Sequence, residues 1–314
     1  MKLSDGAETK GESSTQTDGG RRKQTFRVLT YNVWIAPLVR WNPIENLEAI
    51  CKFIESLDVD IVCLQEAFDW RLGPMGFLCE TLWGGGASFG PLSWFFYVEG
   101  LLFPVSQTCH QKRIIEALLP SLPHHLPSAP IPFGRGHNQG LLVLSKHPLH
   151  RPLRQYLTCT PVHHMGFQAF TVAPLPREGR GKGGEAGARE DIRFVNLHLV
   201  PNFHTHPWKG RVLGWLGERD VPRMQAKQLA EIGEEVGREG GKEGGTGGRA
   251  WCVVGDFNVH RPRVLGVGSL VDQVTCPQEQ HILDHFVSPL PYNYQVFADN
   301  TLSDHYPVLA TFAL

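Results

Sequence analysis

The alternation of apolar and polar residues predicts a series of short strands along most of the chain. In residues 26–32 (FRVLTYN) the side chains alternate with a period of two, which is typical of a β-strand. Similar short apolar runs bounded by turn residues predict further strands at 60–65, 139–145, 167–173, 192–198, 251–257, 282–288 and 306–313.

Three segments show the spacing of a helix instead. In residues 42–57 (NPIENLEAICKFIESL) apolar side chains recur at intervals of three and four residues. A second helix is predicted over 107–119, where Pro120 ends it, and a third begins near Asp220. Strands outnumber helices, and strand-helix-strand units are mixed with neighbouring strands. This order predicts an α/β fold with two packed mixed β-sheets flanked by helices.

Polar segments of low complexity divide the chain without breaking it into domains. Residues 1–24 lack the apolar stretch of a secretory signal and are expected to be a disordered leader. Residues 177–190 and 233–250 combine glycine with charges of both signs, so we expect flexible loops there. Because strand-like runs flank both loops, residues 25–314 are predicted to form a single domain.

Composition and charge narrow the choice of partner and compartment. The chain has 30 Lys and Arg against 31 Asp and Glu, so no overall field attracts a polyanion, and nucleic acid is the less favoured partner. The cysteines are odd in number, and Cys63 and Cys252 lie in apolar runs, which favours reduced thiols over disulfides. We therefore expect a cytoplasmic protein, and no run of residues has the length of a membrane span.

The apolar segment 92–104 (LSWFFYVEGLLFP) has two interpretations. It is either a buried strand and turn, or a surface loop that carries Trp94, Phe95 and Phe96 to a membrane interface. The second interpretation would make the protein peripheral at membranes.

Five apolar runs each carry hard ligand groups at one end. These groups are Asn32, Glu66, His198, Asp256 with Asn258, and Asp304 with His305. Ionised carboxylates beside core strands are costly unless they are paired or bound to a cation. Carboxylate and amide oxygens suit Mg²⁺ or Mn²⁺, and such sites usually serve phosphoryl transfer.

The segments around these groups resemble the endonuclease/exonuclease/phosphatase superfamily, which has a deoxyribonuclease-like fold. The matching pieces occur in the family's order from about residue 25 to the C-terminus: TYNVW, DIVCLQEAFD, NQGLLVLSKHPL, VNLHL, RMQAKQL, VVGDFN, ILDHFVS and LSDHYPV. The resemblance implies a four-layer α/β/β/α sandwich and a hydrolase that depends on Mg²⁺ or Mn²⁺.

The resemblance also implies roles for the groups that bind the metal and activate water. Glu66 would be the principal metal ligand, and Asn32 would share the metal or the phosphate. Asp256 and Asn258 would orient or activate the attacking water and could contact a second metal ion, and Asp304 would lie beside a metal.

Histidines are implied at the phosphate. His198 and His305 would bracket the scissile phosphate, and Asp284 would accept a hydrogen bond from His305 and fix its tautomer. Asn138 would bind substrate near the phosphate.

Within the superfamily the chain looks most like the neutral and bacterial sphingomyelinases. This likeness rests on Phe68 and Asp69 after the QE pair, on NVW with the nearby Pro37, and on SDHYPV with Tyr306. It implies hydrolysis of sphingomyelin to ceramide and phosphocholine at a membrane surface, with no obligate protein partner. The segment VNLHLVPN and the long span 198–223 depart from that family. A nuclease or another phosphodiesterase is therefore the alternative, and a non-catalytic binding protein is disfavoured by the intact set of acids and histidines.

Overall fold

The computed structural model describes residues 25–35, 43–75, 98, 100, 102–131, 137–157, 165–173, 191–201, 221–240 and 250–313. The predicted leader 1–24, the predicted loop 177–190 and the aromatic residues 94–96 lie outside this part of the chain.

One sheet has six strands in the order β14-β15-β1-β2-β6-β5. The strands are β14 (Tyr292–Val296), β15 (Val308–Ala313), β1 (Thr25–Ile35), β2 (Ile61–Ala67), β6 (Leu142–Ser145) and β5 (His124–Pro127). β1 and β2 are parallel, and every other neighbouring pair in this sheet is antiparallel.

The second sheet has five strands in the order β13-β10-β9-β8-β7. The strands are β13 (Asp284–Val287), β10 (Trp251–Asp256), β9 (Ile192–His198), β8 (Gly166–Val172) and β7 (His150–Tyr156). β9 and β10 are parallel, so this sheet also has a central parallel pair.

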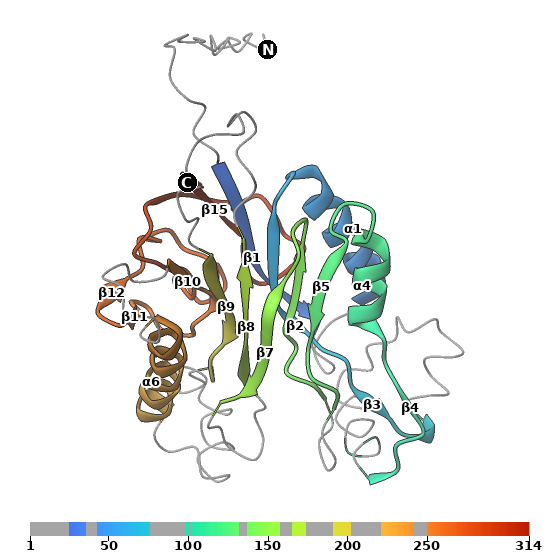
Figure 1. Cartoon of the computed structure of the whole chain (residues 1–314). Coiled ribbons are helices and arrows are strands. Elements are labelled where there is room, and N and C mark those ends of the chain that lie inside the picture. The colour runs from blue at the N-terminus through green and yellow to red at the C-terminus, as the bar shows by residue number, and fades with distance from the viewer. Residues whose placement is uncertain are drawn as a thin grey trace, which may run out of the picture.

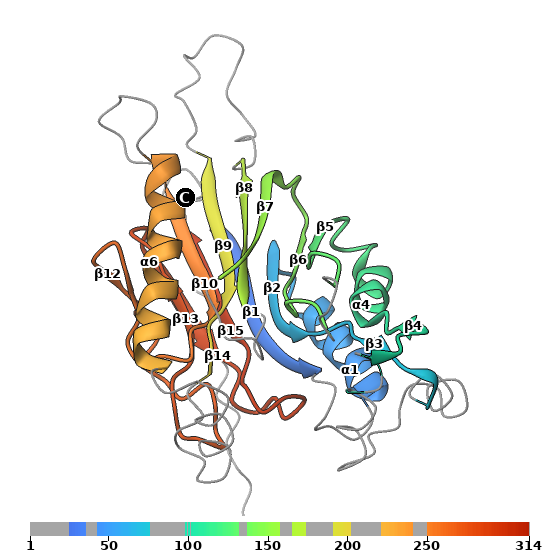
Figure 2. The ribbon, with the colours of Figure 1, turned by 90° about the horizontal axis from the view of Figure 1, so that it is seen from below.

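Helices cover the outer faces of both sheets (Figures 1 and 2). The helices are α1 (Pro43–Ser56), α4 (His110–Leu118) and α6 (Val221–Gly240). Ile50 of α1 and Ile114 of α4 share a buried cluster with Leu64 of β2, whereas Ile232 of α6 packs with Val253 of β10. The layers are therefore helix, sheet, sheet and helix, which confirms the predicted α/β sandwich.

The central core lies between the two sheets and contains no helix residue. Phe194 of β9 stacks on Phe26 of β1 and on Phe170 of β8, with ring centroids 6.0 and 5.6 Å apart. Burial of each such ring contributes about 2 to 3 kcal/mol to folding. This packing holds the two sheets face to face.

The smaller elements lie at the edges of the sandwich. β3 (Arg71–Leu72) pairs with β4 (Ser106–Gln107), and β11 (Arg263–Val264) pairs with β12 (Val267–Gly268). None of the helices in the described part of the chain has the length and apolar character that crossing a bilayer requires.

The structure corrects the loop that was predicted over 233–250. Residues 233–240 were expected in a flexible loop over 233–250, but they belong to α6. The helix continues because Val236, one turn beyond Ile232, is buried against the five-stranded sheet. Residues 241–249 lie outside the described residues.

Candidate active site

The parallel pairs bring the predicted strand-end residues to the same end of the sandwich. Asp256 of β10 lies opposite His198 of β9 in the parallel register and opposite Asp284 of β13 in the antiparallel one. The amide Nδ2 of Asn32 on β1 donates to Glu66 Oε1 at 2.9 Å and to Asp256 Oδ2 at 3.0 Å. The second of these bonds joins the two sheets.

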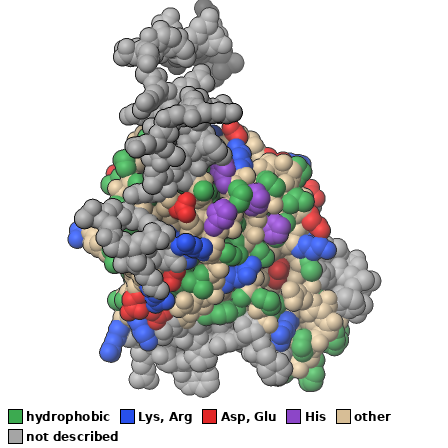
Figure 3. Space-filling view, viewed as in Figure 1, with side chains coloured by type: hydrophobic (Ala, Val, Ile, Leu, Met, Phe, Trp, Pro, Cys, Tyr) green, Lys and Arg blue, Asp and Glu red, His purple; other side chains and the backbone are tan. Residues whose placement is uncertain are grey.

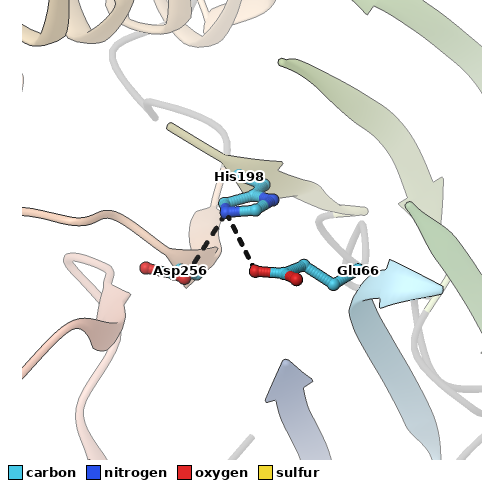
Figure 4. A group of neighbouring side chains, drawn as sticks. All are labelled: Glu66, His198 and Asp256. Carbon is cyan, nitrogen blue, oxygen red and sulfur yellow. Dashed lines mark ion pairs between the residues drawn. The ribbon is translucent and has the colours of Figure 1, made fainter. Parts of the chain in front are cut away.

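His198 lies between the two carboxylates that Asn32 holds. Its Nε2 is 3.5 Å from Asp256 Oδ2 and 3.8 Å from Glu66 Oε1, and Figure 4 shows the ring between the two acids. The side chains of His198 and Asp256 are 3% and 2% exposed, whereas that of Glu66 is 19% exposed. Among these three groups, Glu66 therefore has the most contact with solvent.

His305 and Asp284 form a second unit beside the first. His305 Nδ1 is 2.7 Å from Asp284 Oδ2, and its Nε2 is 3.9 Å from Asp256 Oδ2. Asp284 is fully buried, and its Oδ1 has no hydrogen-bond partner among the described residues. Because Asp284 binds Nδ1, the Nε2 edge of His305 is turned towards Asp256.

Burial shifts the pKa values of the acids upward. Burial, followed by the charge of Asp304, raises the pKa of Glu66 to about 7. Burial raises the pKa of Asp256 to about 8, and it also raises the pKa of Asp304. Although burial alone would lower it, the pKa of His305 is held well above its usual value by Asp284. The negative charge of the site is therefore only partly balanced by the chain.

These groups fit a hard divalent cation. Ligand atoms of Glu66, His198 and Asp256 lie within 4.8 Å of one another, and so do those of Asp256, Asp284 and His305. Carboxylate oxygens predominate, as Mg²⁺ and Mn²⁺ prefer, and a cation would offset the desolvated charge that raises the pKa values. The two groups share Asp256, and the roles of Glu66, Asp256 and Asp304 as metal ligands stay predictions.

The three asparagines differ in what they contact. Asn32 Oδ1 accepts a hydrogen bond from the Trp34 backbone N–H, and Asn32 Nδ2 donates to both acids. Because both polar atoms of the side chain already have partners in the protein, the role of Asn32 as a metal ligand stays a prediction. Asn258 Nδ2 donates to the Leu199 carbonyl, and the Asn258 backbone N–H donates to Asp256 Oδ1. This arrangement fixes the Asp256 carboxylate in place.

Asn138 has a different setting. Its Oδ1 accepts the backbone N–H groups of Asp69 and Gly140, and its side chain is buried. These contacts shape the loop after β2, and a role for Asn138 in substrate binding stays a prediction.

Several supporting residues were missed in the sequence. Ser303 Oγ donates to the Asn32 carbonyl, and Thr275 Oγ1 accepts the backbone N–H of Asp284. Gln65 and Asn196 are fully buried polar residues within strands. The available signal was a polar side chain inside an otherwise apolar run, which is informative because burial of such a group requires partners.

Known proteins share this architecture. The model of the Endonuclease/Exonuclease/phosphatase family matches residues 29–305. No curated protein sequence matches the chain. An endonuclease/exonuclease/phosphatase from Beutenbergia cavernae superposes with a TM-score of 0.57 at 17% identity, over 93% of this chain and 72% of its own.

Two further solved structures are similar over almost their whole length. A beta toxin mutant from Staphylococcus aureus, solved with bound magnesium ions, has a TM-score of 0.57 at 13% identity, over 91% of this chain and 99% of its own. Sphingomyelinase C from Streptomyces griseocarneus has a TM-score of 0.52 at 15% identity, over 93% of this chain and 100% of its own. At these identities the likeness shows a shared fold.

Proposed function

The chain belongs to the Endonuclease/Exonuclease/phosphatase family, and from this premise we propose that it is a Mg²⁺-dependent phosphodiesterase that hydrolyses sphingomyelin to ceramide and phosphocholine. The observation that carries the hydrolase assignment is the convergence of desolvated acids with two histidines at one end of the sandwich. Mn²⁺ would suit the same ligands.

The chemistry follows from the positions of these groups. A cation held by Glu66, Asp256 and Asp304 would offset charge on the phosphate oxygens. Burial raises the pKa of Asp256 to about 8, and a bound cation would keep this carboxyl ionised, so that it could orient and activate the attacking water. Asp284 keeps His305 protonated, so its Nε2–H can donate to a phosphate oxygen or to the leaving oxygen.

An exposed apolar patch supports a lipid substrate. Of the seven large hydrophobic side chains that are exposed among the described residues, four flank β3 and β4 in the chain: Met75, Leu102, Phe103 and Val105. Leu102 and Phe103 are 62% and 65% exposed. β3 and β4 project beside α4 (Figures 1 and 2), and hydrophobic side chains gather over them at the lower right of Figure 3. We call these four side chains the apolar patch.

The apolar patch is close in sequence to the site residue Glu66. β3 starts at Arg71, five residues after Glu66, so it leaves from the end of β2 that carries the site. Aromatic and aliphatic side chains at such a position can insert into the interfacial region of a bilayer. Sphingomyelin presents its phosphodiester at this depth.

Phosphocholine release from sphingomyelin vesicles, measured beside nicking of plasmid DNA, tests the proposal. We expect Mg²⁺-dependent release of phosphocholine that stops with excess chelator. The double change Leu102→Ser and Phe103→Ser should weaken vesicle hydrolysis about 30-fold or more, since each change loses ~1 to 2 kcal/mol of interfacial burial. The matched control is Leu270→Ser, which alters a 58% exposed leucine outside the patch.

Two results would overturn the substrate assignment. DNA nicking without phosphocholine release would make the chain a nuclease, and the apolar patch would then have another role. Equal effects of the patch variant and the Leu270→Ser control on vesicle hydrolysis would remove the apolar patch from membrane binding.

A further inference from the structure

A chain of buried polar side chains crosses the sandwich directly beneath the candidate site. Its members are Thr30 of β1, Gln65 of β2, Asn196 of β9 and Gln168 of β8, and all four are fully buried. Burying an amide without partners costs several kcal/mol, so the hydrogen bonds of this chain decide whether it is tolerated.

Gln65 and Asn196 link the two sheets. Gln65 Nε2 donates to Asn196 Oδ1 at 2.8 Å, across the sandwich, and to Thr30 Oγ1 at 3.1 Å within its own sheet. Asn196 Nδ2 returns a bond to the Leu64 carbonyl of β2 at 3.2 Å. Leu64 and Gln65, which are adjacent in β2, thus both form hydrogen bonds with Asn196 of β9.

Both linked residues are close in sequence to site residues. Gln65 immediately precedes Glu66, and Asn196 precedes His198 by two positions. Residues two apart in a strand face the same side, so Asn196 and His198 both face the other sheet. The separation between β2 and β9 at this point also sets the separation between Glu66 and His198.

Glu66 has an unusual backbone conformation for a strand residue. Successive side chains of a strand face opposite sides, so Glu66 should face away from the side to which Gln65 points. Its φ angle of 54° places it in the left-handed region, and its carboxylate instead meets Asn32 at the site. A non-glycine residue in this conformation costs about 1 to 3 kcal/mol and persists only where its surroundings hold it.

We infer that Gln65 and Asn196 are positioning residues, which hold the backbone before Glu66 so that its carboxylate stays in the site at a fixed distance from His198. This inference rests on the proposed metal-dependent function. The alternative is a purely structural role, in which the two buried amides only provide hydrogen-bond partners for each other between the sheets.

Gln168 provides a matched control within the same layer. Its Nε2 donates across the sandwich to the carbonyls of Leu126 and Leu141, at 3.0 and 3.1 Å. It is the same residue type with the same burial as Gln65. Unlike Gln65, it has no site residue next to it in its strand, and its bond to the linked pair is the longer one that its Oε1 accepts from Asn196 Nδ2 at 3.4 Å. The changes Gln65→Met and Gln168→Met each remove an amide while nearly keeping side-chain volume.

Affinity for Mn²⁺, measured by the paramagnetic signal of the free ion, separates the two roles. Gln65→Met should weaken Mn²⁺ binding about 10- to 100-fold, as is usual when a group that orients a metal ligand is lost. Gln168→Met should lower the melting temperature comparably yet change Mn²⁺ affinity by less than about twofold. Thr30→Val, which removes a single partner of Gln65, should weaken binding in the same direction and serves if Gln65→Met does not fold.

The outcomes distinguish this inference from the proposed function. Equal Mn²⁺ affinity in wild type and in both the Gln65→Met and Thr30→Val variants, or equal weakening by Gln65→Met and Gln168→Met, would overturn the positioning role. A wild-type chain that binds Mn²⁺ but cleaves no sphingomyelin would overturn the substrate assignment alone. A wild-type chain that binds no Mn²⁺ would overturn both.

Discussion

Raised pKa values at the site make the stability of the metal-free protein depend on pH. The pKa of Asp256 is about 8 in the folded chain, against 3.8 for an exposed carboxyl, because burial favours the neutral form. A carboxyl with a raised pKa contributes stability below its unfolded pKa and loses it as the pH rises through the folded value. We therefore expect the metal-free protein to lose stability as the pH rises from 3.8 towards about 8, with little further loss above that value.

The size of this loss of stability follows from the difference between the numbers of protons bound by the folded and the unfolded chain. Integrating that difference for Asp256 from about pH 6.5 to about pH 8.5 gives a loss of about 2 kcal/mol. For a chain of this size the loss corresponds to a fall in Tm of roughly 4 °C. Glu66, with a pKa of about 7, adds a smaller loss of the same sign.

Thermal unfolding in chelator at the two ends of this range is the assay, with Asp256→Asn as the control. The variant keeps the shape of the side chain but removes its titration, together with one of the charges that raise the pKa of His305, so its Tm should fall at least about 4 °C less than that of wild type. Buried thiols such as Cys276, whose pKa is raised to about 11 by burial, act equally in both proteins.

Excess Mg²⁺ should reverse the trend in the wild type. Bound cation needs ionised acids, so the increase in Tm that Mg²⁺ causes should be larger at the alkaline end. The same pH dependence in wild type and Asp256→Asn would refute the assignment of the loss to this carboxylate. An equal Mg²⁺ effect at both pH values would refute the link between cation binding and these acids.

Further changes test individual groups and one loop. Glu66→Gln should lower turnover at least ~100-fold while far-UV circular dichroism stays unchanged, because it removes the charge that would hold the cation; full activity would exclude Glu66 as a ligand. The His305→Ala and Asp284→Ala double variant should cost little more turnover than His305→Ala alone, since the two side chains act as one unit, and additive losses would separate them. Replacing residues 178–190 with a short Gly-Ser link should leave Tm and turnover nearly unchanged, because this composition buries little, and a large loss in either would show that the segment has a structural or binding role.

The strands that the sequence predicts best are those buried on both faces. β9 was predicted at its observed bounds, and every one of its residues is buried. β7 was missed because it lies at a sheet edge and exposes most of its side chains, so no apolar alternation marks it. β14 (YNYQV) also lies at an edge and was missed although its residues do alternate, because the run is only five residues long. Burial in the sandwich, rather than local propensity, determined what could be read from the sequence.

The residue types of the candidate site were predictable, but their mutual contacts were not. Hard ligands at the ends of strands point to one edge of the fold, and the structure brings Asn32, Glu66, His198 and Asp256 together there. The pairing of Gln65 with Asn196 joins residues 131 positions apart, and no local pattern contains that information. The acceptors of each amide follow from how the two sheets pack.

The backbone at Asn258 and Glu66 shows where local preference and tertiary structure diverge. Both residues have positive φ angles, 49° and 54°. Asparagine adopts this conformation readily, so the turn after Asp256 agrees with the sequence. Glutamate does not, and a glutamate at the end of an apolar strand would ordinarily continue its alternation. The conformation of Glu66 is therefore imposed by its surroundings. Such conflicts are expected where a side chain is needed for chemistry, which singles out Glu66 among the acids of the site.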